Sequence, residues 1–317
     1  MPELPEVQTI ADELKKKIVG LKITDVWVDW EKTVRQAGGI EKFKKEISGK
    51  KILSVRRRAK YIIIDIEGKK TIFIHQKISG HLLYGKWSPY EVTPAPNGAG
   101  RRPLGGLLRT GWAQGKVAWT SQIKGPLQDD NRNKYIRAIF FLNNGYQVGF
   151  SDLRRFGKII LVDDEKVGDL KEIRELGPEP LEIKLKDFLA LFDKKRGRLK
   201  QVLMDPTFIA GIGNIYSDEI LWDSGYHPLT KNENLDEKDI TKIYKSIKKI
   251  LAKAIKYKGD SIDDYRLPSG EKGGYQNVQN AYHETNNKCK KKDGGIIKRI
   301  KVGGRSAHFC PVHQILK

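Results

Sequence analysis

The sequence predicts an α+β protein with a first half rich in β-strands and a second half that is mainly helical. Three observations support this fold class. Apolar residues recur at helical spacing just after the N-terminus, and short runs of Ile, Phe, Tyr and Val then follow as far as about residue 163. Beyond a Leu-Gly-Pro-Glu-Pro segment at residues 176–180 the apolar spacing becomes helical again. A length of 317 residues allows two domains.

The first element is an amphipathic helix. Its apolar stripe consists of Val7, Ile10, Ala11, Leu14 and Ile18. Pro5 suits the first helical turn, because its missing N–H leaves no hydrogen bond unmade there. Gly20 is a typical helix stop.

Strands follow the helix. They are expected at residues 60–66, 71–75, 134–142 and 146–150. Asn144-Gly145 is a strong hairpin signal between the last two. Residues 87–132 interrupt this order with Gly, Pro, Trp and many basic residues, so they are interpreted as a long insertion without an assigned role.

Helical spacing dominates after the linker. One short helix is expected around Phe188 and Phe192, and a longer one runs from Ile240 to Ile255 before Gly259. The lysines on the opposite face of the longer helix are interpreted mainly as a solvated surface. Residues 260–288 are polar and Gly-rich, and the last segment has alternating β-like runs around Gly303-Gly304.

Composition narrows the class of protein. The formal net charge of +21 favours a polyanionic partner, although charge alone does not indicate an enzyme. No apolar run approaches the roughly 20 residues of a membrane span. Acidic residues interrupt any signal-peptide pattern at the N-terminus. With only two cysteines, a cytoplasmic location is expected.

The beginning of the chain, Met1-Pro2-Glu3-Leu4-Pro5-Glu6-Val7, carries chemistry. A small second residue allows removal of the initiator Met, which would leave Pro2 as a secondary amine. An α-amine titrates roughly two to three units below a Lys side chain, so it can act as a nucleophile near neutral pH. Glu3 places a carboxylate beside it. A Pro-Glu pair alone is more often an ordinary helix start.

Three further strings occur in order along the chain: Arg56-Arg57-Arg58-Ala59-Lys60, Asp152-Leu153-Arg154-Arg155-Phe156-Gly157, and Gly211-Ile212-Gly213-Asn214-Ile215-Tyr216. Together with the N-terminal string, they resemble the formamidopyrimidine-DNA glycosylase family of bacterial repair enzymes for oxidised purines. The related endonuclease VIII branch usually carries Gly in place of Leu4.

The resemblance implies a fold and its boundaries. An N-terminal β-sandwich with the long helix would span residues 1–163, with the insertion at about 87–132, and a linker would follow at 164–186. A helix–two-turns–helix DNA-binding domain would span 187–288, with a loop at about 266–276 that closes over the flipped base. Residues 289–317 would form a degenerate zinc-finger-like hairpin.

The resemblance also implies a reaction. Pro2 would be the nucleophile, Glu3 would shuttle protons, Lys60 would contact the phosphate beside the damaged nucleotide, and Arg305 in the hairpin would assist the final elimination. The partner would be double-stranded DNA containing oxidised bases, bound by a monomer without a redox cofactor or catalytic metal.

The DNA contacts implied by the resemblance fall into two groups. Arg154, Phe156 and Ile78 would fill the space left by a flipped nucleotide, with Ile78 standing where the family usually has Met. Lys195, Lys200 and Asn214 would contact the backbone of the DNA.

The C-terminus departs from the family, which usually has two Cys-x-x-Cys pairs. Cys289, Cys310 and His313 are candidate zinc ligands, with Asp293 or His308 as the fourth. A hairpin held by packing alone, without zinc, is an equal alternative. Two functional alternatives also stay open: an endonuclease VIII-like preference for oxidised pyrimidines, and a non-catalytic DNA-binding protein.

Overall fold

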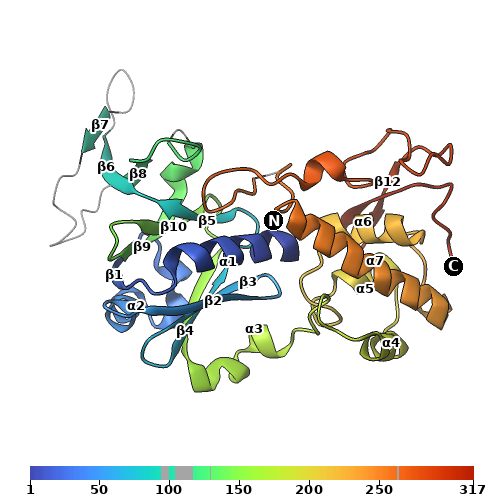
Figure 1. Cartoon of the computed structure of the whole chain (residues 1–317), viewed down its shortest axis with the longest axis horizontal. Helices are drawn as coiled ribbons and strands as arrows, with labels where there is room; N and C mark the ends of the chain where they lie inside the picture. The colour runs from blue at the N-terminus through green and yellow to red at the C-terminus, as the bar shows by residue number, and fades with distance from the viewer. Residues whose placement is uncertain (94–99, 104–116, 129, 263) are drawn as a thin grey trace.

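The computed structural model describes residues 1–93, 100–103, 117–128, 130–262 and 264–317. Strands gather in the N-terminal half and helices in the C-terminal half, with helix α1 lying along the sheets (Figure 1). In the described residues no helix is both long enough and apolar enough to span a bilayer. The gathering of strands in one half and of helices in the other (Figure 1) confirms the expected α+β fold class.

The elements follow one another in this order. The helices are α1 Leu4–Ile18, α2 Ile40–Ile47, α3 Lys171–Arg174, α4 Leu185–Asp193, α5 Leu199–Met204, α6 Asn214–Ser224 and α7 Glu237–Lys256. The strands are β1 Ile23–Val28, β2 Ile52–Arg58, β3 Tyr61–Ile66, β4 Lys70–His75, β5 Gly80–Gly85, β6 Trp87–Thr93, β7 Gly100–Pro103, β8 Val117–Ser121, β9 Ile136–Leu142, β10 Gln147–Asp152, β11 Lys158–Asp163, β12 Lys298–Val302 and β13 Arg305–Phe309.

Two antiparallel four-stranded sheets form the sandwich. Their strand orders are β1-β9-β10-β5 and β11-β4-β3-β2. Helix α1 contributes Val7, Ile10 and Leu14 to the core between them, and all three are fully buried. The apolar stripe read from the sequence therefore faces this core, which fixes the N-terminal end of α1 at the boundary of the two halves.

The insertion contains a third sheet, with the order β7-β6-β8. It adjoins the sandwich through a small core in which Trp87, Trp119 and Leu127 are buried against Trp27. The rings of Trp27 and Trp119 meet edge to face with centroids 5.0 Å apart. The described part of the insertion, for which the sequence pattern predicts no assigned elements, therefore contains strands and a small core of its own.

Helices α4 to α7 pack around the second large core. Helix α7 begins at an Asp236 cap, whose carboxylate accepts the Asp239 N–H at 2.9 Å. The lysines on its other face differ in their surroundings. Lys248 and Lys253 donate to backbone carbonyls of neighbouring segments, whereas Lys245 and Lys256 are exposed to solvent.

The chain ends in the β12-β13 hairpin, whose turn is Gly303-Gly304. Both glycines have positive φ, 55° and 78°. A Cβ on Gly303 would lie 2.3 Å from the side chain of Gln201, so the hairpin tip packs closely against α5. This contact fixes the turn that Arg305 follows at the start of β13.

Candidate active site and DNA-binding surface

The carboxylate of Glu3 is docked on the first turn of α6. It accepts the backbone N–H groups of Gly213 at 2.8 Å, Ile215 at 2.9 Å and Tyr216 at 3.3 Å, and the residue is only 2% exposed. The first N–H groups of a helix lack partners within the helix and carry partial positive charge, so they suit an anion. Glu3 thereby fixes its neighbour Pro2 beside the helical half of the protein.

Lys60 reaches the same place from the sandwich. Its ammonium donates to the Ile212 carbonyl at 3.1 Å, one residue before the N–H groups that hold Glu3. Burial lowers the pKa of Lys60, the nearby charges of Glu3 and Glu6 raise it, and the positive charge of Arg305 lowers it further, with a lowered pKa as the result. The charges of Glu3 and Arg305 thus both act on Lys60.

A buried carboxylate fixes the turn that carries Lys60. Glu179 accepts hydrogen bonds from Arg57 at 2.6 Å, Arg58 at 2.9 Å and the Ala59 backbone at 2.7 Å. Ala59 has a positive φ of 51°, which is unfavourable for a residue with a Cβ, and the Glu179 contact helps to hold it there. Much of the Arg56–Arg58 charge run is therefore internally paired.

Glu6 links the N-terminus to a distant loop. One of its carboxylate oxygens accepts the Glu3 N–H at 2.8 Å, and the other accepts the Asp260 N–H at 2.8 Å and the Tyr216 hydroxyl. Burial, followed by the negative charge of Glu3, raises the pKa of Glu6 to about 7. A carboxyl that titrates near neutrality therefore lies one helical turn from Pro2.

Two exposed loops lie side by side on the sandwich. The buried carboxylate of Asp152 accepts the Ser79 hydroxyl at 2.6 Å, the Arg154 N–H at 3.2 Å and the Gly157 N–H at 2.7 Å. These bonds hold the Ile78 loop against the Arg154–Phe156 loop, and Ile78 and Phe156 are 44% and 57% exposed. Exposed apolar side chains on rigid loops suit insertion into a base stack.

The helical half presents Asn214 at the start of α6. Its side-chain Oδ1 is buried and has no hydrogen-bond partner among the described residues. The residue as a whole is partly exposed, and its expected phosphate contact stays a prediction. Lys195 is one-third exposed and pairs with Asp205 at 2.5 Å.

Lys200 requires a correction. It was expected to contact DNA, but the residue is fully buried, and its ammonium contacts the Asp218 carboxylate at 2.6 Å and the Ser217 hydroxyl at 3.0 Å. The other Asp218 oxygen accepts the backbone N–H of His308 at 2.9 Å. In this conformation Lys200 joins α5, α6 and the hairpin strand β13, and it has no surface to offer to a phosphate.

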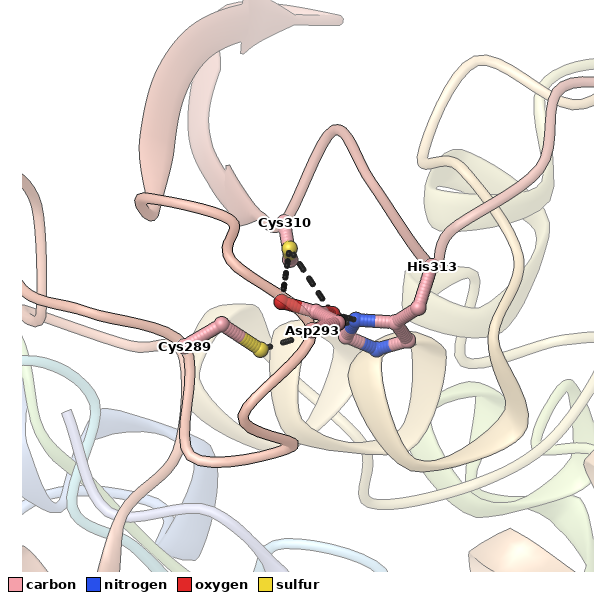
Figure 2. A group of neighbouring side chains, drawn as sticks. All are labelled: Cys289, Asp293, Cys310 and His313. Atoms are coloured by element: carbon pink, nitrogen blue, oxygen red, sulfur yellow. Dashed lines mark hydrogen bonds and ion pairs between the residues drawn. The ribbon is translucent and has the colours of Figure 1, made fainter.

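Four side chains near the hairpin lie close enough to hold a metal ion. Figure 2 shows Cys289, Asp293, Cys310 and His313 converging, and their ligand atoms all lie within 4.8 Å of one another. Nδ1 of His313 lies 3.5 Å from the Cys289 sulfur and 2.6 Å from an Asp293 oxygen. Two sulfurs, one imidazole nitrogen and one carboxylate oxygen match the ligand types of a tetrahedral site.

The orientation of His313 fits a ligand role. Its Nε2 lies 3.0 Å from the Trp222 carbonyl, a contact in which Nε2–H donates and Nδ1 faces the cluster. His308, the alternative fourth ligand, lies elsewhere: its Nδ1 is 2.8 Å from Asp218. The structure therefore groups Asp293, and not His308, with the two cysteines and His313.

Three residues that organise the site were missed in the sequence. Glu6 stands three residues after Glu3 at a helix start, which is a recognisable capping-box spacing. Glu179 was interpreted only as part of a linker, and no local pattern pairs it with the turn at Ala59. The anchoring contacts of Asp152 likewise depend on the fold, although the residue opens the quoted Asp-Leu-Arg-Arg-Phe-Gly string.

Comparisons with known proteins agree over the whole chain. The family model for the formamidopyrimidine-DNA glycosylase N-terminal domain matches residues 1–159, and that for the formamidopyrimidine-DNA glycosylase H2TH domain matches residues 176–266. A formamidopyrimidine-DNA glycosylase of Pelotomaculum thermopropionicum is 34% identical over 319 residues, covering 100% of both chains.

Solved structures give the same result. Lactococcus lactis Fpg in complex with abasic-site DNA is 31% identical with a TM-score of 0.78, over 99% of each chain. A MutM structure with carbocyclic 8-oxo-G DNA is 30% identical with a TM-score of 0.77, again over 99% of each chain.

Proposed function

The chain belongs to the formamidopyrimidine-DNA glycosylase family, and we propose that it excises oxidised purines from double-stranded DNA and then cuts the strand as an abasic-site lyase. The main support is the convergence of Lys60 and of Glu3, the neighbour of Pro2 in the chain, at the start of α6. The names of its relatives, and the lesion and abasic DNA bound by its structural neighbours, favour the same substrate class.

The proposed reaction begins once Met1 has been removed. The lone pair of the Pro2 amine attacks C1′ of the damaged nucleotide, and the bond from C1′ to the base breaks as the base leaves with a proton. Glu3 protonates the sugar ring oxygen, so the ring opens and an iminium ion joins Pro2 to C1′. Its positive charge acidifies the C2′ proton. Loss of that proton expels the 3′ phosphate, and a second elimination expels the 5′ phosphate.

Lys60 and Arg305 would assist through charge. Lys60 lies near Glu3, the charge of Arg305 acts on Lys60, and the strand being cut carries phosphates on either side of the reacting sugar. Ile78, Arg154 and Phe156 would stabilise the duplex after the damaged nucleotide leaves the stack, a distortion that costs a few kcal/mol. No redox step occurs in this sequence of bond changes.

Borohydride trapping tests the nucleophile. Reduction of the imine on a duplex containing 8-oxoguanine should give a covalent protein–DNA product, and peptide mapping should place the link at Pro2. A variant that retains Met1 should bind the duplex yet form no crosslink, because an amide nitrogen cannot attack. Normal trapping by the Met1-retaining variant would overturn the role of Pro2 and favour Lys60 as nucleophile.

We propose zinc as the metal for Cys289, Asp293, Cys310 and His313. It would act structurally by fixing the hairpin that carries Arg305. The binding of zinc requires deprotonated thiols and a neutral imidazole, so the affinity should increase with pH.

Elemental analysis of protein purified without chelator should find about one zinc per chain, as expected for one tetrahedral site. Cys310→Ser should lose the metal. Full activity in zinc-free protein would support a hairpin held by packing alone.

A further inference from the structure

The loop at residues 260–288 is anchored at both ends to buried carboxylates. Its first residue, Asp260, donates its N–H to Glu6. At the other end, Glu219 of α6 is fully buried and accepts the backbone N–H groups of Asn280, Ala281 and Tyr282 at 2.8–3.0 Å. The position of the loop between these two anchors depends on the contacts that its central residues make with the rest of the protein.

The middle of the loop lies against the sandwich and the insertion. In Figure 1 the orange segment after α7 crosses from the helical half to the sheet that contains β5. There the Tyr84 N–H of β5 donates to the Pro268 carbonyl at 2.7 Å. The turn closes with the Gly270 N–H bonded to the Leu267 carbonyl at 2.9 Å. Residues 267–270 therefore form a tight turn attached to an edge strand.

Two residues at the end of the insertion touch this part of the loop. A Cβ on Gly270 would lie 2.6 Å from Leu127 Cδ2, so Leu127 packs directly on that glycine. The guanidinium of Arg132 forms an ion pair with Asp264. One contact is apolar and buried and the other is ionic, and they are six residues apart along the loop.

The segment around Leu127 and Arg132 is itself firmly held. Asn133 is buried, donates to the Leu127 carbonyl at 2.7 Å and accepts the Trp87 indole N–H at 2.9 Å. The Ser151 hydroxyl of β10 donates to the Arg132 carbonyl at 2.7 Å. Hydrogen bonds within the insertion and to β10 therefore hold the described residues at its end in place.

The supported part of the loop lies beside the N-terminus. Tyr265 and Leu267 are buried in the sandwich core with residues of α1, and the Tyr265 hydroxyl lies 3.4 Å from the Glu6 carbonyl. Burial lowers the pKa of His81 to about 3, the positive charges of Arg132, Arg266 and the N-terminal amine lower it further, and the negative charge of Asp264 raises it. Charges of the loop, the insertion and the N-terminus therefore all act on one imidazole on β5.

We propose that Leu127 and Arg132 are positioning residues that hold residues 264–270 beside Pro2, where the loop encloses the damaged base during its excision. The inference rests on the proposed function and extends it by giving the end of the insertion a role. It also predicts a separation of activities. Excision needs an enclosed base, whereas cleavage of a preformed abasic site has no base to enclose.

The experiment compares two duplexes, one with 8-oxoguanine and one with a preformed abasic site. Leu127→Ala and Arg132→Ala should lower single-turnover excision by about 10-fold or more and change abasic cleavage by no more than about twofold, since small misplacements are costly in the reacting geometry. Arg132→Lys should restore part of the excision rate.

Two matched controls belong to the same segment. Lys134→Ala removes a cation from the same short helix, and Ile123→Ala truncates another aliphatic side chain at the same tryptophan-rich core. Neither side chain forms a hydrogen bond or an ion pair with the described loop residues, so both controls should keep wild-type rates.

Amide hydrogen exchange measures how firmly residues 264–270 are held, independently of enzyme activity. The amides of Tyr84 and Gly270 should exchange faster in Leu127→Ala and Arg132→Ala than in the controls. Unchanged exchange in both variants would overturn the inference even in an active enzyme. Faster exchange with equal losses on both duplexes would overturn the role in enclosing the base. A wild-type protein inert on both duplexes would refute the proposed function, while the exchange result would still report on the support.

Discussion

Replacing Glu6 with Gln should remove a distinctive pH dependence of stability. The Glu6 carboxyl is 1% exposed, and burial together with the charge of Glu3 raises its pKa from 4.5 to about 7. Between these values the native protein binds a proton at Glu6 more readily than the unfolded chain does. The contribution of Glu6 to stability is therefore fully present below pH 4.5 and is lost as pH rises through about 7.

The size of the effect follows from the shift. Each unit of pKa difference corresponds to about 1.4 kcal/mol, so a shift from 4.5 to about 7 gives roughly 3 kcal/mol. Two histidines act in the opposite direction. Burial lowers the pKa of His75 and of His81 to about 3, so each favours the native state increasingly as pH rises from about 3 to 6.5. The effect of Glu6 must therefore be measured as the difference in the free energy of unfolding between wild type and a Glu6 variant. The pH dependence of the wild type alone does not isolate it.

Urea unfolding of wild type and Glu6→Gln at a series of pH values from 4.5 to 8 supplies that difference. Because Gln cannot ionise, the free energy of unfolding of wild type minus that of the variant should fall by about 3 kcal/mol across the series. Glu41→Gln, at an exposed position on α2, controls for the loss of one charge. Parallel curves for wild type and Glu6→Gln would refute the argument that burial and Glu3 hold a proton on Glu6.

Three other substitutions test the geometry. Gly213→Ala should reduce base excision by about 100-fold, because its Cβ would lie 2.4 Å from the Glu3 carboxyl, whereas Gly168→Ala, with open space around it, should be neutral in the same rate assay. Glu179→Gln should lower the free energy of unfolding by about 3 kcal/mol in urea, since it leaves Arg57 and Arg58 poorly paired. The Phe156 side chain is 57% exposed, so Phe156→Ala should change the free energy of unfolding by less than about 0.5 kcal/mol. The same variant should weaken cleavage of a duplex with a paired lesion more than that of a duplex with an unpaired lesion. Equal losses on both duplexes would count against insertion of Phe156 into the base stack.

Local patterns predicted most of the fold. The stripe from Val7 to Ile18 faces the sandwich core, and the helix expected before Gly259 is α7. The order of strands within each sheet could not be read from the sequence, because pairing depends on contacts between distant segments. The sheet in the insertion was missed for a related reason: Trp87 and Trp119 stand in a Gly- and Pro-rich segment, and only the neighbouring Trp27 completes their core.

Short strings in the sequence singled out residues that the fold brings to one place, as with Glu3 and Lys60, whose catalytic roles stay predictions. Lys200 shows the limit of this approach. A lysine in a basic, helical DNA-binding segment reads as a phosphate contact, and only the fold reveals the buried Asp218 that pairs with it. The sequence also grouped the three metal-ligand candidates correctly in space, but the choice between Asp293 and His308 required the fold, which pairs His308 with Asp218 and brings Asp293 to the cysteines.

Buried carboxylates explain how a chain with a net charge of +21 orders the loops around this site. Glu3 holds the start of α6, Glu6 and Glu219 hold the two ends of the 260–288 loop, and Glu179 holds the turn before Lys60. Each accepts backbone N–H groups that a loop cannot satisfy by itself. Because these acids are buried, substituting them would change the geometry of the site much more than the electrostatic attraction between the exposed basic surface and DNA.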